Sequence, residues 1–162
     1  MEYESYRNRI GLLNRQLSNQ ISALFRPYLE KYGLTRMQFQ ALFALWLSGP
    51  CTVGELGREV CTDKGNLSAM CKRLEQKGYL LRWRSEEDER VVMLELSDAG
   101  KAAVQDIDGV VGGQMQRSWD CISEKDLEII LSAFERVIAF LEYVTQKREK
   151  SEDGGKTDAV KD

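Results

Sequence analysis

The sequence predicts a mainly α-helical protein that carries one small β-hairpin. Apolar residues recur at steps of three or four over most of the 162 residues, as on one face of a helix. Residues 80–84 and 91–96 instead alternate or run apolar and include the aromatic Trp83 and the β-branched Val91 and Val92, as strands do. Glycines at positions 33, 49 and 78 separate these segments, so several helices and one hairpin follow in order.

Two helices are expected before residue 50. The first, over about residues 3–32, has one apolar stripe, and Pro27 should kink or interrupt it. Thr35 with Gln38 forms a capping box that opens the second helix, which Gly49-Pro50 stops. We expect its buried side to consist of Met37, Ala41, Leu42, Leu45 and Trp46.

Two shorter helices and the hairpin follow. Thr52 with Glu55 caps a helix that ends near Val60, and Thr62 or Asp63 caps another that runs to about Lys77. Gly78 is a natural left-handed terminator. The polar run SEEDER then forms the tip of the hairpin. The core sides of the two helices should be formed by Leu56 and Val60, and by Leu67, Met70, Cys71 and Leu74.

Two long helices complete the chain. The first runs from Asp98 to about Trp119, and its glycines at 109, 112 and 113 should bend or break it, or else let another helix approach closely. Ser123 caps the last helix, whose apolar residues follow alternating steps of three and four, a heptad pattern. Residues 151–162 have almost no apolar content and should be disordered.

Composition excludes several classes of protein. The chain has four cysteines without a CxxC pair and no histidine, so neither a zinc site nor another metal or cofactor is expected. No glycine-rich phosphate loop or catalytic constellation is present, which argues against an enzyme. No apolar run of 18 residues and no signal peptide occur, so we expect a cytoplasmic protein with reduced thiols and no membrane partner.

Positive charge is concentrated in one window. The net charge is −3, yet residues 64–84 hold six basic residues and one acidic residue. Two helices joined by a short turn form a helix-turn-helix, whose second helix reads DNA bases with residues near its start. The candidates for contact with double-stranded DNA are Lys64, Gly65, Asn66, Ser68 and Ala69, with Lys72 and Arg73 suited to phosphates. Each cation alone also fits an ordinary solvated face.

The ordered set of helix pair, hairpin and following helix resembles the MarR family of winged-helix transcription regulators. The resemblance covers roughly residues 5–147 and is most specific in DKGNLSAMCKRLEQKGYLLR, DER and LELSDAG. It implies that the hairpin is a DNA-binding wing, to which Arg84, Asp88 and Arg90 belong. Arg90 would enter the minor groove and Asp88 would orient it. Gly65 and Ala69 depart from the family pattern and reduce direct readout, so sequence choice should lean on DNA shape. The acidic wing tip also departs from it and should weaken non-specific binding and narrow the set of tolerated sites.

The resemblance also implies a domain plan. A dimerisation helix (1–34) precedes the winged helix-turn-helix domain (35–97), and further dimerisation helices (98–150) precede the tail (151–162). The resemblance implies a homodimer that binds a pseudo-palindromic operator and acts as a repressor. The dimer-forming residues expected from the two apolar stripes are Ile10, Leu13, Leu17, Leu127, Ile130, Phe134, Val137, Leu141 and Val144.

Two kinds of signal are considered for such a regulator: a small ligand and the oxidation of a thiol. The resemblance implies a cavity for a small apolar aromatic ligand, with Phe25, Tyr28, Phe39, Phe43 and Trp46 as candidate contacts. A thiol-redox switch is the rival, but peroxide-sensing relatives carry an N-terminal cysteine and this chain has none before Cys51. Cys61 and Cys71 are expected to be core residues. A winged-helix module that binds protein instead of DNA remains the alternative of a different class.

Overall fold

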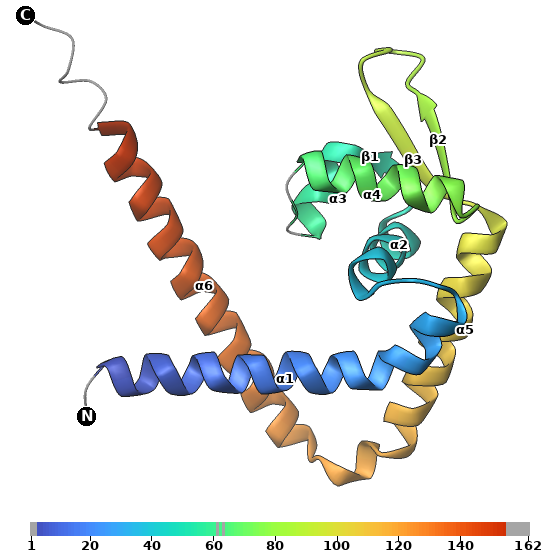
Figure 1. Ribbon diagram of the computed structural model, residues 1–162. Helices are drawn as coiled ribbons and strands as arrows, with labels where there is room; N and C mark the ends of the chain where they lie inside the picture. The colour runs from blue at the N-terminus through green and yellow to red at the C-terminus, as the bar shows by residue number, and fades with distance from the viewer. Residues whose placement is uncertain (1–2, 61, 63, 155–162) are drawn as a thin grey trace, which may run out of the picture. The chain divides into compact units, whose positions relative to one another are not determined.

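The computed structural model describes residues 3–60, 62 and 64–154, and it forms two compact units, Met1–Met115 and Gln116–Asp162. The mainly α-helical fold with a small hairpin is confirmed (Figure 1). The helices are α1 (Tyr3–Lys31), α2 (Arg36–Ser48), α3 (Val53–Glu59), α4 (Lys64–Gln76), α5 (Asp98–Arg117) and α6 (Glu124–Gly154), with a short 3-10 helix, η1 (Trp119–Cys121). The strands are β1 (Cys51–Thr52), β2 (Leu80–Arg84) and β3 (Val92–Leu96).

Capping boxes fix the starts of α2 and α3. The main-chain N–H of Gln38 donates to Thr35 Oγ1 at 3.2 Å, and the N–H of Thr35 donates to Gln38 Oε1 at 3.0 Å. Thr52 and Glu55 make the same reciprocal pair at α3. Both boxes were predicted, since they depend only on residues three positions apart.

The core face of α2 differs from the prediction at its edges. Ala41, Leu42 and Leu45 are buried as expected, but Met37 and Trp46 are 42% and 38% exposed. These two side chains lie on the flanks of the helix, outside the arc that faces the core. The buried set instead includes Gln38, Phe39 and Ala44.

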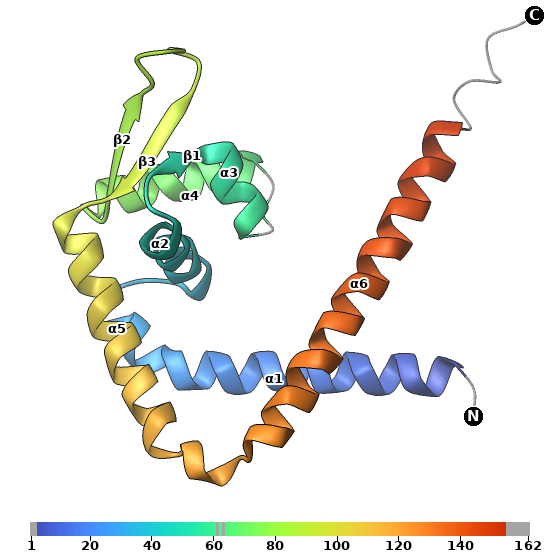
Figure 2. The same ribbon diagram turned by 180° about the vertical axis from the view of Figure 1, so that it is seen from behind.

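The sheet has three antiparallel strands in the order β1-β3-β2 (Figure 2). Cys51 pairs with Leu94, and Leu80 pairs with Leu96. Strand β1, of two residues, was not predicted because so short a segment has no readable alternation. It matters because it joins the hairpin directly to the residue that caps α3.

Two helices continue where the sequence allowed a break, so a break at either place is wrong. Helix α1 continues through Pro27 to Lys31, where the buried Leu29 and half-buried Tyr28 hold its last turn against the core. Helix α5 continues past Gly109 and Gly112 because Val104, Ile107 and Val111 anchor its inner face. A Cβ at either glycine would meet no atom within 4 Å, so neither glycine serves a close helix approach.

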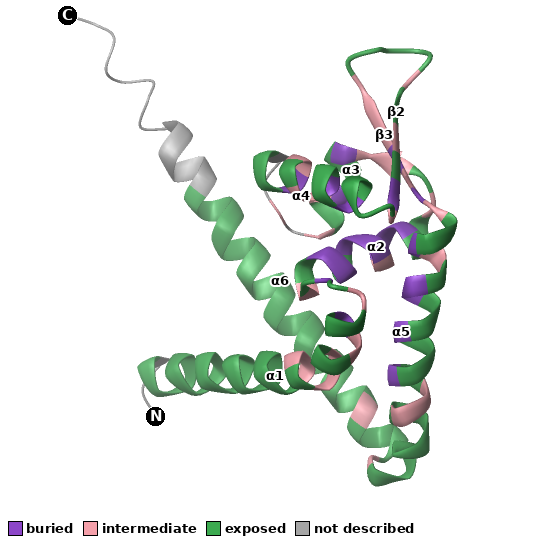
Figure 3. Ribbon diagram, turned by 45° about the vertical axis from the view of Figure 1, so that its right-hand side comes forward, coloured by how far each residue is buried: buried purple, intermediate pink, exposed green. Residues whose placement is uncertain are grey.

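The core of the first unit lies among α2, α3, α4, β3 and α5 (Figure 3). Its largest fully buried side chains include Leu42, Leu56, Leu67, Leu74, Leu94 and Ile107. Full burial of each such side chain contributes about 1.5–3 kcal/mol. Helix α4 and the hairpin are therefore fixed to one another through a shared core.

Two long apolar stripes stay exposed. On α1, Ile10, Leu13 and Leu17 are exposed, and on α6 so are Phe134, Leu141 and Val144 (Figure 3). Helix α6 reaches Gly154, past the predicted end at 150, and the rest of the predicted tail lies outside the described residues. No helix in the described part of the chain is long and apolar enough to cross a membrane.

Candidate nucleic-acid interface

The packing of α4 determines which of its side chains face outward. Leu67, Cys71 and Leu74 are buried toward the core, which turns the opposite face to solvent. That face carries the exposed residues Gly65, Asn66, Ala69, Lys72 and Arg73, while Ser68 is half-buried. Lys64 is the first residue of the helix, and its side chain lies outside the described residues, as does Asp63.

Three exposed cations of α4 and the wing form no ion pair with the described residues. Among the described residues, the ion pairs join Lys31 to Asp106, Arg82 to Glu75, and Lys101 to Glu95. None of them involves Lys72, Arg73 or Arg90. An unneutralised cation on an exposed face can contact a phosphate.

Three hydrogen bonds, each with a main-chain group on at least one side, close the loop of the wing tip. The N–H of Arg90 donates to Asp88 Oδ1 at 2.9 Å, and the N–H of Ser85 donates to the carbonyl of Val91 at 3.0 Å. Arg84 donates from its guanidinium to the carbonyl of Glu89 at 2.7 Å. Asp88 therefore acts on the main chain of Arg90, and Arg84 braces the loop from the strand below it.

Arg82 is a cation that the sequence reasoning missed. Its guanidinium NH1 lies 3.1 Å from Glu75 Oε2 on α4, and its side chain is only 15% exposed. Its Nε is buried and has no hydrogen-bond partner among the described residues. The period of two in β2 carries the signal, since Arg82 is two positions from the buried Leu80 and shares its face.

A cavity of about 300 Å³ lies where α3, α4 and the wing meet. Two arginines, Arg82 and Arg90, line it together with Ser68 of α4. The remaining lining residues are Thr52, Val53, Gly54, Val91 and Val92. None of the described residues in this lining is a carboxylate, although the sequence of the wing tip is acidic.

A larger cavity of about 590 Å³ lies in the first unit and is lined mainly by apolar residues. Three of the predicted ligand contacts, Phe25, Phe39 and Phe43, line it, and neighbouring ring centroids are 5.5 and 5.7 Å apart. Tyr28 and Trp46 do not line it. The other lining residues are Ile21, Arg36, Gln40, Ala44, Leu47, Glu59, Val60 and Asp108.

The thiols differ in access. Burial raises the pKa of the Cys71 thiol to about 11, and burial also raises the pKa of the half-buried Cys51. Cys121 is exposed on η1, and Cys61 lies outside the described residues. A thiol with a raised pKa is a poor nucleophile at neutral pH, because the thiolate is the reactive form.

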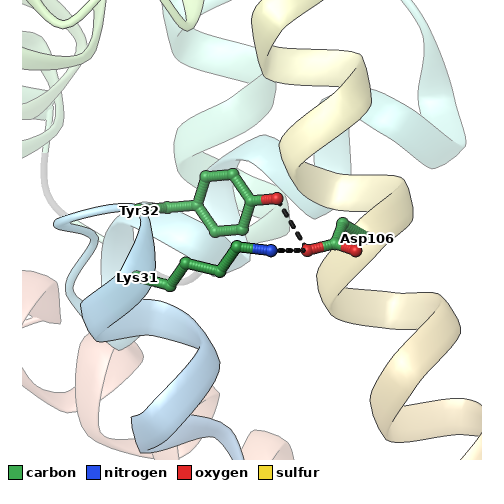
Figure 4. Close-up of polar contacts among 3 residues, drawn as sticks. All are labelled: Lys31, Tyr32 and Asp106. Carbon is green, nitrogen blue, oxygen red and sulfur yellow. Dashed lines mark hydrogen bonds and ion pairs between the residues drawn. The ribbon is translucent and has the colours of Figure 1, made fainter.

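One polar cluster ties the end of α1 to α5 (Figure 4). Asp106 accepts hydrogen bonds from Lys31 Nζ at 2.7 Å and from the Tyr32 hydroxyl at 2.6 Å. The Lys31 bond, followed by the Tyr32 bond, lowers the pKa of Asp106, and the same carboxylate raises the pKa of Lys31. Tyr28 adds a second tie, since its hydroxyl accepts from Gln114 Nε2 at 2.6 Å.

A helix-turn-helix followed by a wing defines a class of DNA-binding proteins, and comparisons with known proteins agree. The family model described as "Transcriptional regulator SarA/Rot" matches residues 23–107. The organic hydroperoxide resistance transcriptional regulator of Bacillus subtilis is 34% identical over 120 residues, which cover 72% of this chain and 82% of that protein. SarZ of Staphylococcus haemolyticus is 28% identical over 132 residues, covering 82% and 88% of the two chains.

The solved structures agree on the fold. A mutant MarR of E. coli, complexed with operator DNA, superposes with a TM-score of 0.73 at 22% identity, covering 85% of this chain and 99% of that one. The chain belongs to the SarA/Rot family of MarR-type winged-helix regulators. It is a DNA-binding transcriptional regulator.

Proposed function

We propose that this regulator works as a homodimer that binds a pseudo-palindromic operator and represses transcription from it. The observation that carries the proposal is the outward face of α4, with Lys72 and Arg73 exposed, beside a wing that presents Arg90. A helix of this kind reads the major groove, and an arginine on an adjacent arm can enter the narrow minor groove. DNA-contact candidates are Lys64, Gly65, Asn66, Ser68, Ala69, Lys72, Arg73, Arg84, Asp88 and Arg90.

The dimer is inferred from the exposed stripes of α1 and α6. Apolar side chains such as Leu13, Phe134 and Leu141 are about half exposed in the single chain. Contiguous apolar surface of this kind marks a protein interface. A two-fold dimer would place its two α4 helices in successive turns of the major groove, about 10–10.5 base pairs apart.

Selection of bound fragments from random duplex DNA tests this function. We expect a pseudo-palindrome with half-sites about one helical turn apart, and an affinity that falls steeply as salt rises. Arg90→Ala should weaken operator binding strongly while the melting temperature stays unchanged. Absence of any enriched sequence from a folded dimer would favour the protein-binding module instead.

For the signal, we propose a small apolar aromatic ligand in the 590 Å³ cavity. Phe25, Phe39 and Phe43 supply ring faces, and the one guanidinium of the lining, Arg36, already donates to Ser18 O and Ser22 Oγ. A ligand releases DNA if it binds a dimer with wrongly spaced α4 helices more tightly. Toluene and benzoate are matched probes: toluene should raise the melting temperature more, and Phe39→Ala should abolish the difference.

A thiol-redox response is the second candidate, favoured by the similarity to a regulator named for hydroperoxide resistance. Operator binding measured before and after cumene hydroperoxide, in the native chain and in Cys121→Ser, tests it. Loss of binding that Cys121→Ser prevents would support this candidate over the ligand.

A further inference from the structure

The 300 Å³ cavity between α4 and the wing lies where a DNA strand has to pass. In the proposed complex α4 occupies a major groove and the wing enters the neighbouring minor groove. One sugar–phosphate strand separates two adjacent grooves, so that strand crosses the protein between Ser68 of α4 and Arg90 of the wing. Both residues line the cavity.

We propose that this cavity holds one backbone phosphodiester of the DNA, and that Arg82 is its buried cation. The proposal rests on the proposed function, because it requires α4 and the wing to be on DNA together. The site suits any phosphate: two guanidinium groups, Arg82 and Arg90, line it with the Ser68 hydroxyl, and none of the described lining residues is a carboxylate.

The state of Arg82 supports a ligand role. Its NH1 is engaged by Glu75 at 3.1 Å, which holds the planar group in place. Its Nε is buried and lacks a partner among the described residues. A buried donor without a partner is costly, and a rotation of the guanidinium toward an anion in the cavity would satisfy it. Arginine also presents several donors in a fixed plane, which suits phosphate oxygens.

The contact between Arg82 and Glu75 would also give Arg82 a positioning role. It joins β2 to α4 through Glu75, so a phosphate bound there would couple the wing to the recognition helix. If Arg82 only held β2 against α4 through Glu75, loss of Glu75 and loss of Arg82 would have the same effect. A role in binding phosphate predicts opposite effects, because only Arg82 carries the positive charge.

The experiment compares Arg82→Gln with the matched control Glu75→Gln, each with both operator and unrelated duplex DNA over a range of salt. We expect Arg82→Gln to weaken binding to both DNAs about tenfold, and to reduce the slope of log K against log salt by about 0.9, the loss of one phosphate contact. Glu75→Gln removes the negative charge but keeps an oxygen that can accept from Arg82 NH1, so it should leave the slope unchanged and the affinity equal or higher. Arg82→Lys, which keeps the charge, should restore the slope.

Two results would overturn the site, and a third would overturn the proposed function. Equal losses of affinity and melting temperature in Arg82→Gln and Glu75→Gln would show that Arg82 only holds β2 against α4 and does not bind phosphate. Saturable binding of inorganic phosphate without DNA at sub-millimolar concentration, abolished by Arg82→Gln while the salt slope stays unchanged, would assign the cavity to a free anion. Absence of DNA binding by the unaltered protein would instead contradict the proposed function itself, before any variant is compared.

Discussion

Gly100 stands where the start of α5 comes closest to the chain before the wing. A Cβ built on Gly100 would lie 2.2 Å from the carbonyl oxygen of Tyr79, a distance that main chain cannot accept. Ser97 fixes the same junction, since its N–H donates to that carbonyl and its hydroxyl accepts from the N–H of Gly100. The close approach explains why a glycine ends the run LELSDAG.

Gly100→Ala should therefore destabilise the protein by about 1–3 kcal/mol, the usual cost of overpacking. Urea unfolding followed by circular dichroism measures it. Gly109→Ala is the matched control in the same helix, where a Cβ meets no atom within 4 Å. It should be stabilising by about 0.4–1 kcal/mol. Equal stabilities of the two variants would show that the start of α5 yields easily.

Cys71 is the thiol for which the structure makes the sharpest chemical prediction. It is fully buried, and its pKa is raised to about 11 by burial. Iodoacetamide at pH 8 should therefore label Cys121 first and leave Cys71 unlabelled until denaturant is added, as read by peptide mass spectrometry. Labelling of Cys71 in the native protein at the rate of Cys121 would mean that α4 opens readily.

At the scale of elements, the tie between α1 and α5 gives a prediction on pH. The pKa of Asp106 is lowered by Lys31 and Tyr32, so its contribution to stability is present above its ordinary value of 3.8 and is lost as pH falls through the lowered pKa. The pKa of Lys31 is raised above 10.5, so the same contact weakens again only when pH rises beyond that value.

Asp106→Asn should therefore lower the melting temperature at pH 7, and the difference from the unaltered protein should shrink below about pH 4. Thermal unfolding at a series of pH values measures this difference. Asp108→Asn, two residues further along the same helix and therefore on a nearly opposite face, controls for the loss of charge alone. A difference that is constant from pH 7 to pH 3 would rule out the ionised contact as its cause.

The helices and strands also show which structural features can be predicted from a sequence. The capping boxes of α2 and α3, the glycine stops and the hairpin were predicted because their signals are local. The continuity of α1 through Pro27 and of α5 through its glycines was not, since buried residues such as Leu29 and Ile107 override local propensity. Strand β1 exists only through its pairing with β3.

The candidate site also has some features that the sequence predicts and others that it does not. The outward face of α4 could be predicted, since the spacing of Leu67, Cys71 and Leu74 determines which residues point away from the core. The bracing of the wing by Arg84 and the burial of Arg82 against Glu75 could not. Both contacts join β2 to a residue on another segment, and their partners become known only when the chain is folded.

At the scale of the whole molecule, charge and apolar surface are separated along the chain. The protein carries a net charge of −3, while residues 64–84 are strongly basic. Repulsion of DNA by the acidic remainder favours contact through that window alone. The exposed apolar stripes lie outside that window in the sequence, on α1 and α6.

Phe134→Asp tests whether the apolar stripe of α6 forms the interface of the proposed dimer. A charge in the middle of the α6 stripe should prevent dimerisation, because a buried unpaired carboxylate costs several kcal/mol. Sedimentation velocity should then show a monomer, and affinity for a two-half-site operator should fall to that for a single half-site. Glu135→Lys changes the neighbouring residue off the apolar stripe and should leave both measurements unchanged. A Phe134→Asp protein that stays dimeric and binds its operator normally would place the dimer interface elsewhere on the chain.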